Sequence, residues 1–206
     1  MPIKKLGIAL VSVVIAASAG CRTKAIDKMA FKSALNNYYA SRDECLWPEA
    51  VKFPAQADAK SDEQTKGFDA LTDAGLLTRT PEEKKRFLIG SKSVNDYDLS
   101  DKGRSVWTAD AAQPGYGNFC YGHPQVTSID SFAPADNPDA SQFSVTYHDQ
   151  VTSVPDWANS PEMRTAFPKI ATDTSGAQTA TANITKSENG WQVTSVQPIS
   201  TAAQGQ

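Results

Sequence analysis

FSVTY, residues 143–147, is the stretch on which the fold depends. Its three apolar side chains alternate with the hydroxyl groups of Ser144 and Thr146. A period of two is typical of a strand that buries one face and exposes the other. The chain is therefore expected to contain a sheet with one covered face.

Further strands are expected on both sides of this one. Residues 126–132 also lie near alternating strand positions. Residues 177–186 and 191–196 flank an Asn189-Gly190 pair, which is a strong short-range signal for a hairpin. The region 116–200 is therefore expected to form an antiparallel sheet of about four strands.

Helical patterns dominate the first half of the chain. Apolar residues recur at helical spacing within residues 25–43 and predict an amphipathic helix. Ser61 and Gln64 have the spacing of a capping box, and Gly75 is placed to end the helix that they open. Ser160, followed directly by a proline, predicts one short helix beside the sheet.

Residues 68–104 begin with FDALTDAGLLTRT and end with YDLSDKGR. This segment resembles the winged-helix family. The resemblance implies a helix that ends in a glycine, a first strand, and a second strand that returns across a wing.

These segments combine into an α+β fold. Residues 21–115 are expected to form a helical, winged-helix-like half packed on the C-terminal antiparallel sheet of residues 116–200. Residues 201–206 offer nothing to bury and are expected to be a flexible tail. The two halves are expected to form one compact unit.

The N-terminus carries an export signal. Lys4 and Lys5 precede an apolar run from Leu6 to Ala19, which is shorter than the roughly 20 residues that a membrane-spanning helix needs. The sequence Ser18-Ala19-Gly20-Cys21 then resembles the lipobox of bacterial lipoproteins, with Ser18 where that family usually has leucine. The resemblance implies removal of residues 1–20 as a signal peptide and attachment of lipid to Cys21.

An ordinary cleavage site competes with this interpretation. Ala17-Ser18-Ala19 fits the small-x-small pattern of the general signal peptidase, and cleavage there would release a soluble protein. The chain has three cysteines, and an odd thiol in an oxidising compartment would be left unpaired. Lipid on Cys21 leaves Cys45 and Cys120 to form a disulfide. By resemblance to lipoproteins of diderm bacteria, Arg22 after the cysteine favours the outer membrane, facing the periplasm.

The charge of the chain excludes one class of partner. Lys and Arg number 20 against 23 Asp and Glu, and the net charge is −3. Loss of residues 1–20 removes two lysines and no acid, which leaves 18 basic residues against 23 acidic ones and a charge of −5. Phosphate backbones select basic surfaces, so nucleic acid is not an expected partner.

Two histidines offer the main alternatives for chemistry. His123 and His148, with Cys45 and Cys120, have the ligand types of a zinc or copper site, but the cysteines are expected to pair and no metal is assigned. Either histidine, with a serine, would suit a hydrolase. The neighbouring Asp149 is poorly placed to orient His148, because adjacent strand residues point to opposite faces. No motif of a nucleophile elbow is present.

Aromatic residues near the junction of the halves give a softer signal. Trp107, Tyr116, Tyr121 and Trp157 are candidates to line a groove for a peptide or a glycan, and the alternative is a core that joins two layers. The expected function is a non-catalytic envelope lipoprotein that binds or scaffolds another envelope component, a protein or a glycan, without a cofactor. An envelope hydrolase that uses His123 or His148 and a metal-handling protein are the alternatives.

Overall fold

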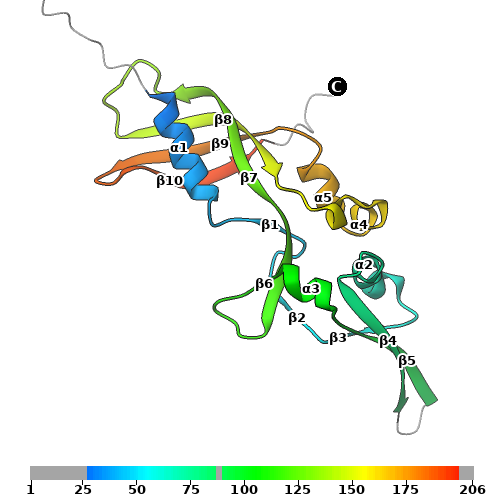
Figure 1. The fold of residues 1–206 in the computed structure, drawn as a ribbon. Helices are drawn as coiled ribbons and strands as arrows, with labels where there is room; N and C mark the ends of the chain where they lie inside the picture. Colours follow the sequence, from blue (N-terminus) through cyan, green and yellow to red (C-terminus); the bar gives the residue numbers. More distant parts are fainter. Residues whose placement is uncertain (1–26, 87–89, 200–206) are drawn as a thin grey trace, which may run out of the picture.

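A computed structural model describes residues 27–86 and 90–199, and these form two antiparallel sheets (Figure 1). In the larger sheet, five strands lie side by side in the order β1 (Glu44–Cys45), β7 (Tyr116–Ala133), β8 (Gln142–Thr152), β9 (Gln178–Ser187) and β10 (Gly190–Pro198). Two short strands also pair with β7, namely β2 (Val51–Lys52) and β6 (Trp107–Ala109). The smaller sheet has three strands in the order β3 (Ala55–Asp58), β5 (Gly90–Leu99) and β4 (Leu77–Arg86).

The expected fold class, a helical N-terminal half on a sheet of about four strands, is wrong. The larger sheet has seven strands, and the N-terminal half supplies three of them, β1, β2 and β6. These strands are two or three residues long, too short to show a period of two. Residues 81–95 look like a polar connection, yet most of them extend the β4–β5 hairpin through backbone pairing.

The strand β7 spans 18 residues and changes partners along its length. Its first part pairs with β1, β2 and β6, and from His123 onward it pairs with β8. Gly122 lies at the change of partner, where an added Cβ would meet Val151 Cγ1 at 2.2 Å. A side chain at this position would therefore displace Val151 of β8, and glycine allows the close approach.

The helix α1 (Lys28–Tyr39) covers one face of the larger sheet (Figure 1). Asp27 caps it by accepting a hydrogen bond from the Met29 backbone N–H at 2.9 Å. The Phe31 ring lies 5.0 Å from that of Phe143 and 5.2 Å from that of Trp191. This first core is completed by Leu35 of α1 and by buried strand residues: Val126, Val145, Tyr147, Ala180, Ala182 and Ile184.

The expected strand and hairpin of the C-terminal region are confirmed. Phe143, Val145 and Tyr147 of β8 are buried against α1. β9 and β10 form an antiparallel hairpin, and Gly190 adopts a φ of +106° at its turn, a value that few other residues tolerate.

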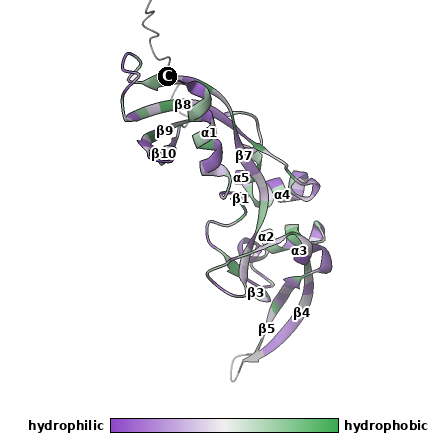
Figure 2. Cartoon of the chain, turned by 60° about the vertical axis from the view of Figure 1, so that its left-hand side comes forward, coloured by the Kyte–Doolittle hydropathy of each residue, from purple (hydrophilic) through white to green (hydrophobic). Residues whose placement is uncertain are grey.

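A second core lies beside the smaller sheet. Its helical elements are α2 (Asp62–Asp73), α3 (Asp101–Val106), the 3₁₀ helix η1 (Asp156–Asn159), α4 (Pro161–Ala166) and α5 (Pro168–Asp173). Part of β7 is hydrophobic where it passes between the two cores (Figure 2). The largest fully buried side chains of this core are Leu71, Leu76, Tyr97, Phe119, Tyr121, Met163 and Ile170.

The two halves of the sequence exchange elements between these cores. α1 comes from residues 21–115 but packs on strands of residues 116–200, whereas α4 comes from the second half and packs against both α2 and α5. A disulfide between Cys45 and Cys120 joins β1 to β7. It closes a separation of 75 residues, which stabilises the fold by roughly 4 kcal/mol in the chain-entropy account.

The segment 68–104 contains a helix and two returning strands. α2 ends before Gly75, whose φ is +76°, and β4 pairs antiparallel with β5. Pro81 lies in β4, which is an edge strand and so loses no ladder hydrogen bond to it. The winged-helix resemblance itself stays a prediction.

The expected anchor lies outside the described residues, because Cys21 and the signal peptide fall within residues 1–26. The tail 201–206 lies outside them as well. Among residues 27–86 and 90–199, no helix has the length and apolar character to cross a membrane.

Phe31→Ala tests the contact between α1 and the larger sheet. We expect it to lower the free energy of unfolding by roughly 3–5 kcal/mol, because the ring is 1% exposed and its removal leaves a cavity. Met29→Ala on the same helix is the control, since Met29 is 70% exposed and its loss should change stability by less than about 0.5 kcal/mol. Urea unfolding followed by tryptophan fluorescence measures both. Equal effects would show that α1 is not fixed to the sheet through Phe31.

Candidate functional site

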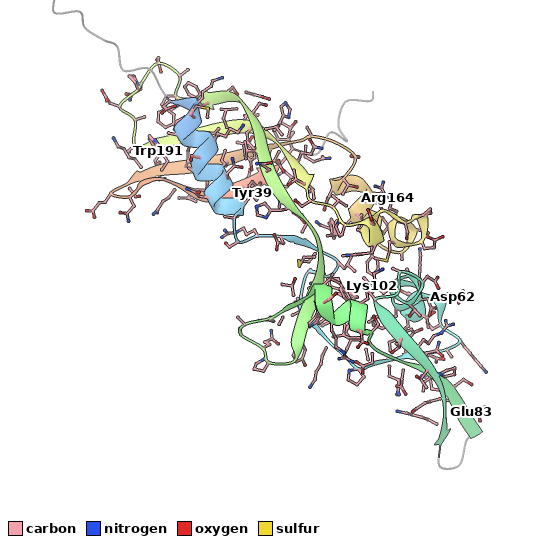
Figure 3. The ribbon with its side chains drawn as sticks, in the orientation of Figure 1. Tyr39, Asp62, Glu83, Lys102, Arg164 and Trp191 are labelled. Carbon is pink, nitrogen blue, oxygen red and sulfur yellow. A yellow bond between two sulfur atoms is a disulfide. The ribbon has the colours of Figure 1, made fainter. Side chains whose placement is uncertain are left out.

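A cavity of about 420 Å³ lies between the two cores, and we call it the junction cavity. It is formed where the end of α1 meets β1, α5 and the ends of β8, β9 and β10. Figure 3 labels Tyr39, which marks the end of α1 that faces this junction. The lining residues are Tyr39, Glu44, Asp149, Val151, Thr172, Asp173, Gln178, Thr179, Ala180, Val196, Pro198 and Ile199.

Lys169 of α5 connects the elements around the junction cavity. Its ammonium donates to the Asp173 carboxylate at 2.5 Å, to the Tyr121 hydroxyl at 3.1 Å and to the Glu44 carboxylate. Burial lowers the pKa of Lys169, but these hydrogen bonds outweigh it and hold the pKa above its usual value. The Tyr121 hydroxyl donates in turn to Asp173, and burial followed by this bond raises the pKa of Tyr121. The network fastens α5 to β1 and β7.

Asp149 of β8 lines the same cavity, but Lys169 does not contact its carboxylate. In the part of the chain that the structure describes, no ion pair joins its carboxylate. Burial is the largest cause that raises the pKa of Asp149, and the negative charge of Glu44 is the second. Ionised Asp149 therefore costs folding free energy. Groups with pKa values perturbed in this way concentrate at functional sites.

Tyr39 lines the α1 side of the junction cavity, and the buried Tyr147 is its hydrogen-bond partner. The hydroxyl groups of Tyr39 and Tyr147 lie 2.7 Å apart and share a hydrogen bond. Burial raises the pKa of both phenols, so both stay neutral at physiological pH. Tyr39 therefore presents an uncharged aromatic side chain to the cavity.

The disulfide positions Glu44 in the cavity. Cys45 lies opposite Cys120 in the pairing of β1 with β7, and Glu44 lies opposite Gly122. Because Glu44 directly precedes Cys45, the disulfide holds in place the backbone from which the glutamate side chain extends. The expected Cys45–Cys120 disulfide is present, and β1 connects it to Glu44 in the cavity.

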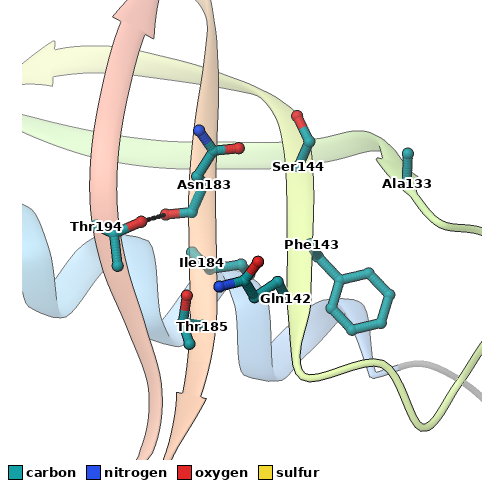
Figure 4. A pocket seen from close by; sticks show the side chains of 8 residues that line it. All are labelled: Ala133, Gln142, Phe143, Ser144, Asn183, Ile184, Thr185 and Thr194. Carbon is teal, nitrogen blue, oxygen red and sulfur yellow. Dashed lines mark hydrogen bonds between the residues drawn. The ribbon is translucent and has the colours of Figure 1, made fainter.

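A second hollow lies on the face of the larger sheet away from α1 (Figure 4). It measures about 490 Å³ and its polar side chains are uncharged, among them Gln142, Ser144, Asn183 and Thr194. The Thr194 hydroxyl donates to the Asn183 backbone carbonyl at 3.0 Å. Among the residues that the structure describes, no ionisable side chain lines this hollow, so it lacks the electrostatic asymmetry of the junction cavity.

The aromatic residues expected to bind a ligand lie mostly in the second core. Tyr121 is fully buried, Trp157 is 8% exposed, and Trp107 packs against the same core. Tyr116 is the exception at 36% exposed, and the Lys52 ammonium lies 5.8 Å from its ring. Of these four, Tyr121 contributes to the site, through its hydroxyl group beside Lys169.

The two histidines have different surroundings. His123 Nδ1 lies 2.9 Å from an Asp43 carboxylate oxygen. His148 Nε2 lies 2.9 Å from Asp130 Oδ2, and its Nδ1 lies 3.0 Å from the Thr179 hydroxyl. These last three groups come from the adjacent strands β7, β8 and β9, and we call them the Thr179–His148–Asp130 row. The row has the order of nucleophile, base and orienting acid.

The cysteines are not free to act as metal ligands, because Cys45 and Cys120 are bonded to each other. Within the described ranges, no group of three or more His, Cys, Asp or Glu side chains is arranged to hold a metal ion. The metal-handling alternative thereby loses both thiolates on which it depended.

The charged residues of the junction cavity do not follow from sequence patterns. Glu44, Asp149 and Lys169 lie on three elements that are far apart in the chain, and each looks like an ordinary surface residue. One signal is local: Lys169 and Asp173 have the i,i+4 spacing of a helical ion pair, directly after Pro168. That spacing predicts their pairing but not the cavity.

Asp149→Asn tests the electrostatic cost of the junction cavity. A raised pKa means that the folded protein retains its proton to a higher pH than the unfolded chain, so stability falls as pH rises from Asp149's ordinary value through the raised one. We expect the variant to be more stable than the wild type at about pH 7, and the difference to vanish below about pH 3.5. Asp136→Asn removes an exposed carboxylate and serves as control. Urea unfolding at several pH values measures the effect, and a pH-independent difference would contradict it.

Comparison with known proteins leaves the site to be interpreted from its own residues. No family model, no curated protein and no solved structure matches this chain.

Proposed function

We propose that this protein is a non-catalytic lipoprotein of the bacterial envelope that binds a segment of another envelope component in the junction cavity. The observation that carries the proposal is the composition of that cavity, which combines apolar walls with a few carboxylates in about 420 Å³. Ligand sites are commonly concave and largely apolar, with a small number of polar groups that fix orientation. The raised pKa of Asp149 adds a group held at a cost to stability.

The proposed anchor sets the distance to the membrane. Lipid on Cys21 would hold the protein on the outer membrane, facing the periplasm. Lys28, at the start of α1, lies seven positions after Cys21 in the chain, so α1 would begin within about 25 Å of the lipid. The lobe of α2, β4 and β5 lies at the opposite end of the molecule from the start of α1 (Figure 1). The junction cavity lies between the two and is within reach of a partner in the periplasm.

Photo-crosslinking from the rim of the cavity tests the proposal. Benzoylphenylalanine in place of Pro198, which is exposed and lines the cavity, is expected to give a discrete adduct with one envelope component in intact cells. The adjacent Gln197 is equally exposed but does not line the cavity, because neighbouring strand residues point to opposite faces. Benzoylphenylalanine at position 197 is therefore the matched control. The same adducts from both positions, or none from either, would contradict binding in the junction cavity.

A hydrolase is the second candidate, and the Thr179–His148–Asp130 row favours it. A proton on His148 Nε2 that faces Asp130 leaves Nδ1 to accept the Thr179 hydroxyl hydrogen. The threonine oxygen would then bond to an acyl carbon, its proton would pass to His148, and the leaving group would take that proton. We place this candidate second because His148 and Asp130 are 37% and 38% exposed and neither lines the junction cavity. Acyl transfer benefits from a site that excludes water.

A fluorophosphonate probe separates the two candidates. If the hydrolase is right, the probe labels Thr179, and His148→Gln lowers the labelling rate by at least about tenfold because the base is lost. His123→Gln is the matched control, since His123 pairs with Asp43 and lies outside the row. We expect no labelling of the wild type above that of Thr179→Val, and specific labelling of Thr179 would overturn the non-catalytic assignment.

A further inference from the structure

The junction cavity has an unbalanced set of charges. Three carboxylates line it, those of Glu44, Asp149 and Asp173, and no lysine or arginine of residues 27–86 or 90–199 is among its lining residues. Lys169 at its margin contacts two of the three, Glu44 and Asp173. One positive charge therefore faces three negative ones.

Asp149 is the carboxylate that this lysine does not reach. Within residues 27–86 and 90–199, no ion pair involves it, and the charged groups that act on it are Glu44, Asp173 and His148. The two acids oppose its ionisation, and the half-exposed His148 belongs to the opposite face of β8. A positive charge that entered the cavity would relieve this repulsion.

Much of the remaining cavity wall is aliphatic, beside the uncharged polar side chains of Thr172, Gln178 and Thr179. Val151, Ala180 and Val196 come from three adjacent strands, and Pro198 and Ile199 extend the wall toward solvent. Ile199 is 46% exposed. Aliphatic surface beside an isolated carboxylate is complementary to an ammonium group carried on a chain of methylenes.

We propose that the junction cavity binds the side chain of a lysine on a partner protein, with its methylenes against Val151 and Val196 and its ammonium beside Asp149. This inference rests on the proposed function and names the partner chemistry for the same cavity. The side chain would bring the missing positive charge, so binding and charge compensation occur together. The chain's own residues 200–206, which follow the cavity rim, contain no basic side chain to fill this role.

Two short peptides that differ in one group test this inference. Acetyl-Gly-Lys-Gly-amide carries the ammonium, and acetyl-Gly-norleucine-Gly-amide keeps the methylenes without the charge. We expect the lysine peptide to shift the methyl NMR signals of Val151, Ala180 and Val196 in the full chain, and the norleucine peptide to bind at least about tenfold more weakly. Asp149→Asn is expected to lower the affinity for the lysine peptide by about tenfold, and Asp136→Asn is expected to leave this affinity unchanged. Raising the salt concentration should weaken the binding of the lysine peptide and leave the binding of the norleucine peptide unchanged.

The outcomes separate this inference from the proposed function. Equal affinity for the two peptides, or an unchanged affinity in Asp149→Asn with native methyl shift dispersion, would overturn the lysine assignment and leave the cavity as a binding site. If neither peptide shifts those methyl signals but crosslinks still form from position 198, the inference fails alone. If crosslinking from position 198 fails as well, both proposals fall.

Discussion

The backbone of β7 hydrogen-bonds to strands from both ends of the chain, and the rest of the fold depends on this shared pairing. Its first part binds β1, β2 and β6, and its second part binds β8. Phe119 and Tyr121 face the second core, and Val126 faces the first. One strand thus belongs to two hydrophobic cores, which cannot separate without breaking its ladder.

This shared strand explains why a cavity forms where it does. Near Gly122 the pairing of β7 with β1 ends and its pairing with β8 begins, and the core that β7 contributes to changes from the one that contains α5 to the one that contains α1. Neither core extends across the change, so side chains at the end of one element face the end of another. The Cys45–Cys120 disulfide and the Lys169 network hold these ends together.

The junction cavity contains two carboxylates held by an ion pair and a third, that of Asp149, without one among the described residues. Glu44 and Asp173 are engaged by Lys169, which gives the wall a fixed geometry. Asp149 has no such partner within the described residues, and burial raises its pKa. A fold that retains an ionisable group at a cost to stability fits a site whose function needs the group, because activity and stability compete at such positions.

Local patterns determined the strand at residues 143–147, the hairpin around Asn189-Gly190, the helix that follows Ser160 and the pairing of Cys45 with Cys120. Each of these depends on a few neighbouring residues or on a count of cysteines, so no knowledge of the rest of the chain was needed. The strands β1, β2 and β6 were not predictable, because two or three residues carry no period and form strands only where β7 offers backbone partners. The junction cavity was decided by tertiary structure alone, since Glu44, Asp149 and Lys169 acquire their meaning from a proximity that no spacing in the sequence encodes.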